Sequence, residues 1–443
     1  MTPSIASLQK RHMLCLLVFT SFILSDCSRV AADENNPIEV KAPSKILQAK
    51  YSRDLNDVVF ESTPERLKRG EYLTEGLYCT TCHSEKDKTK PGGPAIQEKK
   101  FAGAERYKTD STHLYAPNLT PDEKTGIGLW TDDMLARAIQ EGVGHDGRAL
   151  LLPGRGGMPW KSLRNLSDED LASIIVYLRT LPPIENTIPQ RNVGDRLEQT
   201  FVSRPYPKKG TRRPVNMDNP IERGTYLINL AHCNGCHRSD FGGGFRINTR
   251  DDKNIVSPNL TSDVTGIGGW TEEAFISTIR NGSGKSGELD YSMPWISFRN
   301  LTDEDLAAIY AALMETIPFK HLVLNNLPDT YCEVCNLDHG GGELNEKEVP
   351  ADSLVKNLPS ELDGIYVSTD FPQDTLKIFH EDDKTWITRG KTNNRKWPFI
   401  AVNESVYRAQ DFQSPYVLIR NAEGKITGMQ NHLKMDGEYL KLE

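Results

Sequence analysis

The sequence of 443 residues lacks several features that would assign it to other classes of protein. It has no long low-complexity tract, and a content of 37% hydrophobic and 26% charged residues is typical of soluble globular domains. The apolar run from Met13 to Leu24 covers only twelve residues, which is too short to span a bilayer. The chain is too long for one ordinary domain, so we expect two or three separate cores.

The chain also lacks an excess of positive charge. Its formal net charge is −8, and it becomes −10 without residues 1–32, which hold three basic residues and one acidic residue. An acidic protein repels phosphate backbones, so we expect no nucleic-acid partner. We also find no pairing of a nucleophile with a base, no nucleotide-binding fingerprint and no metal cluster, which argues against substrate chemistry of its own.

Residues 1–32 have the pattern of a secretory signal peptide. Lys10 and Arg11 precede the apolar run, and Val30-Ala31-Ala32 supplies a small-residue cleavage site. We therefore expect an exported, periplasmic protein. Lipid attachment at Cys27, with peripheral membrane association, is an alternative, although Asp26 matches poorly the small residue usual at that position.

What the chain does contain is two C-x-x-C-H motifs, the signature of covalent c-type haem attachment. They are Cys79-Thr-Thr-Cys82-His83 and Cys233-Asn-Gly-Cys236-His237. In such a motif both thiols bond to one porphyrin, and the imidazole binds its iron. The sequence thus predicts two covalently attached haem c groups, with two ordinary disulfides as the alternative.

Each motif lies within a longer repeated unit, which indicates internal duplication. Arg69-Gly-Glu-Tyr-Leu73 precedes the first motif and Arg223-Gly-Thr-Tyr-Leu227 the second. The segments P-N-L-T, T-G-I-G-x-W-T, M-P-W and L-[ST]-D-E-D-L follow both motifs in the same order. The repetition identifies equivalent positions in the two units.

Capping residues predict where the main helices of each unit begin. Thr63 and Asn219, each followed by proline, would begin a helix ahead of each motif. Ser167 and Thr302 resemble the first residue of a capping box, with an acidic residue three positions later. Apolar residues at helical spacing follow Ser167, so an amphipathic helix should end each unit. These residues are Leu171, Ile174, Ile175 and Leu178.

The repeated units define the expected domains. Residues 60–190 and 216–325 would each form a haem-binding domain, joined by a linker at 191–215 that carries a basic stretch. Residues 326–355 would form a second linker. Residues 356–443 have short β-branched and aromatic runs separated by turns, which predicts a small antiparallel β domain, a barrel or a sandwich, with a packing or docking role.

Duplication also selects the second iron ligand. Met158 and Met293 recur in register and are each followed by Pro-Trp, whereas Met134, Met217 and Met314 have no counterpart in the other unit. A thioether paired with an imidazole gives an electron carrier rather than an open iron site. We therefore predict Met158 and Met293 as the distal ligands.

The tryptophans and histidines near the motifs have less specific roles. The tryptophans of both units would either line the haem edge or pack in the core; they are Trp130, Trp160, Trp270 and Trp295. His113, His145 and His232 have no counterpart in the other unit, so we do not expect them to bind iron.

Each haem-binding imidazole needs a hydrogen-bond partner on its other ring nitrogen. Pro94 could offer its carbonyl in the first unit only. If the repeats share one device, Pro117 and Pro258 are the matched pair.

A third C-x-x-C pair, Cys332 and Cys335, has Asn336 where a haem-binding histidine would stand. A third haem is therefore not expected, and a disulfide is the preferred interpretation. A metal site with His339 would have only three nearby ligands.

Together these motifs resemble the class I cytochrome c modules in the cytochrome subunits of membrane-bound bacterial alcohol and sugar-acid dehydrogenases. The resemblance covers about residues 60–320. It implies two all-α cytochrome c domains, ligation by His83 with Met158 and by His237 with Met293, and passage of electrons from a dehydrogenase towards quinone or a terminal oxidase. Members of that family commonly carry three haems, and the β domain is a further departure from the pattern.

We therefore expect an electron-transfer protein rather than an enzyme. One iron would accept an electron and the other would donate it. A dihaem peroxidase is the enzyme alternative, but it would need one iron without its methionine. A haem-based redox sensor, with the β domain as its functional core, is a third possibility.

Overall fold

The computed structural model describes residues 58–108, 113–146, 150, 157–190, 215–248, 253–284, 287–346, 358–369, 374–390, 396–401, 406–409, 412–431, 433 and 438–442. The expected signal peptide, Cys27 and almost all of the 191–215 linker lie outside these residues. Within the described ranges, every helix is too short or too polar to cross a membrane.

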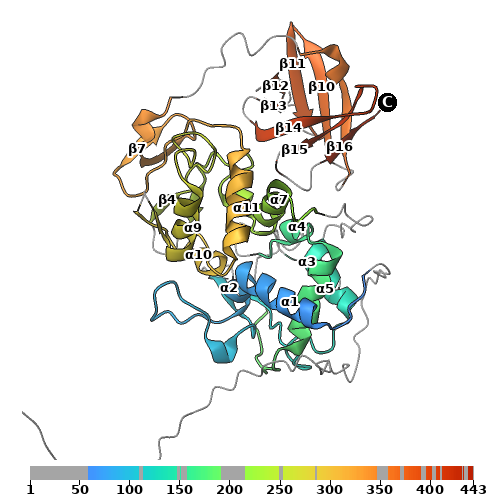
Figure 1. Ribbon diagram of the computed structural model, residues 1–443, viewed down its shortest axis with the longest axis vertical. Helices are drawn as coiled ribbons and strands as arrows, with labels where there is room; N and C mark the ends of the chain where they lie inside the picture. Colours follow the sequence, from blue (N-terminus) through green and yellow to red (C-terminus); the bar gives the residue numbers. More distant parts are fainter. Residues whose placement is uncertain are drawn as a thin grey trace, which may run out of the picture. The chain divides into compact units, whose positions relative to one another are not determined.

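The first repeat, residues 58–190, is built around two long helices that pack against each other. Its elements are α1 (Pro64–Gly76), α2 (Cys79–His83), β1 (Ala104–Lys108), β2 (His113–Ala116), α3 (Asp132–Glu141), α4 (Trp160–Leu163) and α5 (Asp168–Thr180). Figure 1 shows α1 beside α5, and the short α2 carries the first C-x-x-C-H motif. The expected N-caps Thr63 and Ser167 are confirmed, because their hydroxyls accept backbone N–H groups of the first turn.

The second repeat, residues 215–325, has the same order of helices, with an additional short pair of strands, β5 and β6, after its third helix. They are α7 (Pro220–Leu230), α8 (Cys233–Cys236), β3 (Arg246–Asn248), β4 (Asn254–Val256), α9 (Glu272–Asn281), β5 (Ser283–Gly284), β6 (Gly287–Glu288), α10 (Trp295–Phe298) and α11 (Asp303–Met314). Helix α7 packs against α11 as α1 packs against α5. Asn219 and Thr302 cap α7 and α11 as expected.

Neither repeat is purely α-helical, which corrects the all-α expectation. Strand β1 pairs with β2, and β3 pairs with β4, in short antiparallel ladders between the C-x-x-C-H motif and the P-N-L-T segment. The chain reverses direction in this stretch, and the ladder satisfies backbone groups that a helix would otherwise satisfy.

The glycine of each R-G-x-Y-L segment permits the close helix packing. A Cβ atom on Gly70 would lie 2.0 Å from the Ser173 carbonyl oxygen, and one on Gly224 would lie 1.8 Å from that of Ala308. No side chain fits at either position without separating the helices. The matched glycines therefore set how closely α1 approaches α5 and α7 approaches α11.

The arginine of the same segment pairs with the helix that it packs against. Arg69 makes a two-pronged contact with the Asp170 carboxylate, at 2.8 and 2.9 Å. Arg223 pairs with Asp305 through its Nε alone, and its other guanidinium nitrogens bind Glu304. The predicted capping boxes are thus only half formed, because these carboxylates bind an arginine rather than the N-cap backbone.

The tyrosine of each segment reaches across to the other repeat. Tyr226 donates its hydroxyl hydrogen to Asp170 at 2.7 Å and accepts from the Ser167 N–H. Tyr72 makes the equivalent contacts with Asp305 and the Thr302 N–H. The contacts are reciprocal, as in a twofold interface. Consistent with this, the buried apolar residues of the two repeats form one continuous core.

The segment expected to be a second linker contains a β-hairpin. Strands β7 (Asp329–Cys332) and β8 (Leu337–Gly340) pair antiparallel, and a short 3₁₀ turn at Gly342–Leu344 follows. Asn336 takes a left-handed backbone conformation in the turn, with φ of 56°. The thiols of Cys332 and Cys335 are free here, so the preferred disulfide is not formed.

The C-terminal domain is a closed antiparallel barrel, which decides between the barrel and the sandwich. Its strands are β9 (Gly364–Ser368), β10 (Thr375–Glu381), β11 (Lys384–Arg389), β12 (Trp397–Ala401), β13 (Val406–Ala409), β14 (Phe412–Arg420), β15 (Ile426–Asn431) and β16 (Glu438–Lys441). Neighbouring strands pair in sequence order, and β16 pairs with β9 to close the ring. Figure 1 shows these strands in orange and red.

Candidate haem sites

Both C-x-x-C-H motifs are held in the same backbone geometry. Each motif forms a single short helical turn, α2 or α8, directly after one residue in the left-handed conformation. That residue is Tyr78, with φ of 33°, in the first repeat and His232, with φ of 53°, in the second. Positive φ is uncommon for bulky residues. Its recurrence at matched positions indicates that the chain turns sharply into both motifs in the same way.

The two motif histidines are oriented by the predicted pair of proline carbonyls. His83 Nδ1 lies 2.8 Å from the Pro117 oxygen, and His237 Nδ1 lies 2.8 Å from the Pro258 oxygen. A carbonyl only accepts, so each Nδ1 carries the hydrogen and each Nε2 keeps its lone pair. The prediction of Pro117 and Pro258 as partners is confirmed.

Burial keeps these groups uncharged. Burial lowers the pKa of His83 to about 4, partly opposed by its hydrogen bond to Pro117, and it also lowers the pKa of His237. Burial raises the pKa of the Cys79 and Cys233 thiols to about 12. At neutral pH both imidazoles are therefore neutral, as an iron ligand must be.

In the second repeat the predicted ligands line one cavity. Its volume is about 650 Å³, within the range of cofactor pockets, and its walls are mostly apolar. Cys233, Cys236, His237 and Met293 all contribute to the lining. Two thiols, an imidazole with a free Nε2 and a thioether around an apolar cavity are the donor set of a covalently attached haem, so these residues fit that group.

In the first repeat, Met158 is half-buried against the common core, as Met293 is in the second. Pro159 and Pro294 follow the methionines, and each is the N-cap of a short helix, with nearly identical φ and ψ. The methionines therefore lie at the end of a loop, just ahead of a helix.

The tryptophans divide between the two roles that the sequence left open. Trp270 lines the cavity of the second repeat. Trp160 and Trp295 instead pack on glycines, since a Cβ on Gly142 or Gly282 would lie 2.5 or 2.3 Å from the ring. Their role is core packing at the C-terminal ends of α3 and α9.

Of the histidines considered as competing ligands, His145 and His232 contact residues of the protein. The His145 ring lies 4.3 Å from the Trp130 ring, centroid to centroid. His232 Nδ1 lies 2.6 Å from the Ser162 hydroxyl oxygen. These contacts agree with packing roles.

The residues that precede the two motifs bring the repeats together. Tyr78, next to Cys79 of the first motif, lines the cavity of the second motif, and its hydroxyl donates to the Ala231 carbonyl. His232, next to Cys233, makes the reverse contact with Ser162 of the first repeat. Sequence reasoning missed this crossing, because no local pattern marks a contact between repeats.

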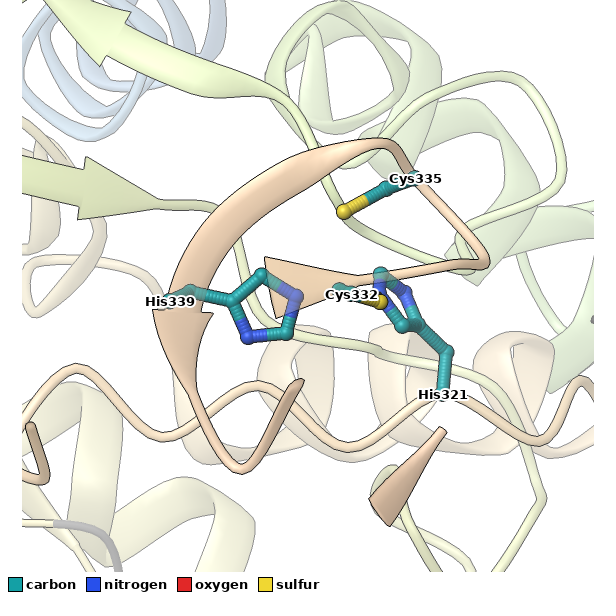
Figure 2. A group of neighbouring side chains, drawn as sticks. All are labelled: His321, Cys332, Cys335 and His339. Atoms are coloured by element: carbon teal, nitrogen blue, oxygen red, sulfur yellow. Dashed lines mark hydrogen bonds between the residues drawn. The ribbon is translucent and has the colours of Figure 1, made fainter. Parts of the chain in front are cut away.

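Sequence reasoning also missed a second cluster of ligating side chains. His321, which follows α11, joins Cys332, Cys335 and His339 around one point (Figure 2). The sequence analysis had found three of these residues and expected no metal cluster. The spacing of His321, eleven residues ahead of Cys332, was the signal available.

The sequence comparisons agree with the site. Residues 219–311 match the family described as cytochrome C oxidase, cbb3-type, subunit III, a range that holds the second haem motif and Met293. The resemblance to dehydrogenase cytochrome subunits is confirmed by similar proteins with those names.

The relatives are similar to this chain at modest identity. The alcohol dehydrogenase (quinone) cytochrome c subunit of Gluconacetobacter polyoxogenes is 26% identical over 329 residues, covering 62% of this chain and 66% of that protein. The gluconate 2-dehydrogenase cytochrome c subunit of Pantoea cypripedii is 28% identical over 236 residues, covering 51% and 49%. A diheme cytochrome c-type protein of Cereibacter sphaeroides is 26% identical over 197 residues, covering 43% and 64%. The matches thus span less than two thirds of the length of these relatives.

Proposed function

We propose that this chain is an exported dihaem cytochrome c that relays electrons between a dehydrogenase-type donor and a respiratory acceptor. Residues 60–190 and 216–325 are, in this proposal, two class I cytochrome c domains with one haem each. The attachment residues and iron ligands are Cys79, Cys82, His83 and Met158 for one haem and Cys233, Cys236, His237 and Met293 for the other.

A haem held by such residues supplies a one-electron couple of its iron. The chain contributes binding and orientation. The Pro117 and Pro258 carbonyls hold the imidazoles in one tautomer, and the apolar walls around His237 and Met293 limit the access of water. Low polarity and a thioether ligand both favour the reduced state of such a site, which suits an acceptor of electrons.

The observation that carries the proposal is the contact that Tyr78 of the first repeat makes with the second repeat. The residue that adjoins the first haem-attachment cysteine lines the cavity of the second motif. Electrons pass between centres only over short distances, so two sites that share a wall are suited to exchange electrons with each other. The names of the similar proteins, cytochrome c subunits of dehydrogenases, support the same role.

The test is to compare electron transfer with peroxide turnover. The fully reduced protein should pass two electrons rapidly to a small soluble cytochrome in a stopped-flow experiment, while its peroxidase turnover stays near that of free haem. A variant with Cys233→Ser and Cys236→Ser should deliver only one electron per chain. Peroxidase turnover far above that of free haem, and dependent on one intact motif, would establish the dihaem peroxidase instead.

The cellular context is part of the proposal. The pattern of residues 1–32 supports export to the periplasm, with peripheral membrane association through a partner or through Cys27. Fractionation of cells followed by mass analysis of the mature chain would test both. Capture of the mature protein from its own membranes would show whether a dehydrogenase subunit accompanies it.

A further inference from the structure

The four side chains of His321, Cys332, Cys335 and His339 converge behind the β7–β8 hairpin. One ligating atom from each lies within 4.8 Å of those of the other three, and all four residues are buried (Figure 2). Cys332 ends β7, Cys335 lies in the turn and His339 lies in β8. The hairpin therefore supplies three donors, and His321 approaches from the segment that follows α11.

Backbone carbonyls orient the two imidazoles so that their Nε2 atoms can serve as ligands. His321 Nδ1 donates to the Gly242 carbonyl at 2.7 Å, which leaves the lone pair of Nε2 facing the Cys332 sulfur at 3.5 Å. His339 Nδ1 lies 3.0 Å from the Gly340 carbonyl. Backbone carbonyls commonly orient metal-binding histidines in this way.

His339 also has a polar atom that the protein leaves unsatisfied. The side chain is fully buried, and its Nε2 has no hydrogen-bond partner among the described residues. An unpaired polar atom in the interior costs about 1 to 3 kcal/mol. A cation bound at this nitrogen would remove that cost, since Nε2 would become a ligand.

The distances fit a tetrahedral zinc ion. Zinc binds sulfur at about 2.3 Å and imidazole nitrogen at about 2.0 to 2.1 Å, so neighbouring ligand atoms lie roughly 3.4 to 3.8 Å apart. The separation of 3.5 Å between Cys332 Sγ and His321 Nε2 is one such edge. The upper limit of 4.8 Å for the group requires only small side-chain movements to complete the others.

The backbone holds the two cysteines in a tight turn and packs closely over the cluster. The Asn336 N–H donates to the Cys332 carbonyl at 2.9 Å and closes the turn that presents both sulfurs. Gly244, with φ of 79°, passes so close that a Cβ there would lie 2.7 Å from Cys335 Cβ and from His321 Cε1. A loop of the second repeat thus closes over the site, which leaves no room for a substrate.

We propose that His321, Cys332, Cys335 and His339 bind one zinc ion, and that this ion fixes the β7–β8 hairpin to the second repeat. Two cysteines and two histidines, buried and without an open position, are the ligand set of a structural zinc site. Binding converts both thiols to thiolates and releases two protons to solvent, so the two thiolates neutralise the charge of the ion. A disulfide would satisfy the sulfurs but leave the His339 nitrogen unpaired.

The first test is elemental analysis of the full-length, haem-loaded protein. We expect one zinc per chain, in addition to the haem iron. X-ray absorption at the zinc edge should show two sulfur and two nitrogen neighbours. A chain without stoichiometric metal would overturn the proposal, whether its thiols are free or its mass shows the loss of two hydrogens that a disulfide causes. Stoichiometric copper in place of zinc would overturn it as well.

The second test uses variants. His339→Gln and Cys335→Ser should each lower the affinity for added Zn²⁺ at least tenfold, measured by competition with a chromophoric chelator, because each removes a ligand. His113→Gln, a histidine in β2 outside the cluster, should bind zinc as the wild type does. If the ligand variants retain wild-type zinc content, the ion binds elsewhere; if they do not fold, the elemental analysis and absorption spectrum of the wild type still decide.

Discussion

At the scale of single residues, the two repeats behave as internal controls for each other. Pro117 and Pro258 occupy matched positions, and both accept a hydrogen bond from a motif histidine at 2.8 Å. His232 and Tyr78 also occupy matched positions but differ in chemistry, so only their shared backbone conformation reflects the fold. Agreement between repeats therefore separates what haem binding requires from what each unit adds.

The proposed methionine ligands give the first prediction. Met158→Ala or Met293→Ala should lower the reduction potential of one haem, because the thioether stabilises ferrous iron, and should open that iron to added cyanide or imidazole. Redox titration and ligand-binding spectra measure both effects. Met217, which is half-buried and has no counterpart in the other repeat, provides the control: Met217→Ala should alter neither property. Wild-type spectra in both ligand variants would make these methionines packing residues.

At the scale of elements, the R-G-x-Y-L segment shows how one short pattern organises a unit. Its glycine sets the helix distance, its arginine pairs with the first turn of the packed helix and its tyrosine crosses to the other repeat. Burial and the bond to Asp305 raise the pKa of Tyr72 to about 12. The hydroxyl therefore stays protonated at neutral pH and donates to the carboxylate.

The interface between repeats gives a stability prediction. Asp305 is 1% exposed and accepts from both Arg223 and Tyr72, so Asp305→Ala should cost about 2 to 3 kcal/mol by removing charge-assisted hydrogen bonds in the interior. Asp303, in the same helical turn, has a side chain that is 74% exposed where it pairs with Arg280. Asp303→Ala should cost less than about 1 kcal/mol.

Denaturant unfolding followed by far-ultraviolet circular dichroism measures both variants. Tyr72→Phe should have an intermediate effect, since it removes the hydroxyl contacts but leaves the pair of Asp305 with Arg223 intact. Equal midpoints for Asp305→Ala and Asp303→Ala would mean that the crossing contacts do not stabilise the interface.

The elements that the sequence predicted are those with local signals. The helix starts could be predicted because an N-cap is a contact within four residues of the chain. The residues concerned are Thr63, Asn219, Ser167 and Thr302. The short β-branched and aromatic runs of residues 356–443 lie in barrel strands such as β9 and β11, whereas polar residues interrupt β13 and β15. His321 escaped notice because it lies outside the β7–β8 hairpin that carries its three partners, and no local pattern links the two segments.

At the scale of the whole molecule, the proposal predicts two haems rather than three. A denaturing haem assay combined with intact mass should give two covalent haems per chain, because Asn336 replaces histidine after the third cysteine pair. Cys79→Ser with Cys82→Ser should lower the number to one. A value of three would show that Cys332 and Cys335 bind haem, and would also exclude zinc at those sulfurs.

The barrel at the C-terminus is a ring in which β16 pairs with β9, so each strand has a neighbour on both sides. An open sheet offers its outer strand as a template, and foreign chains can extend it by main-chain hydrogen bonds. The closed barrel has no free outer strand, so a foreign chain cannot extend it in this way. A partner that docks on this domain must recognise side chains and loops, which makes recognition there specific to sequence. The closed ring also protects the domain from edge-to-edge aggregation.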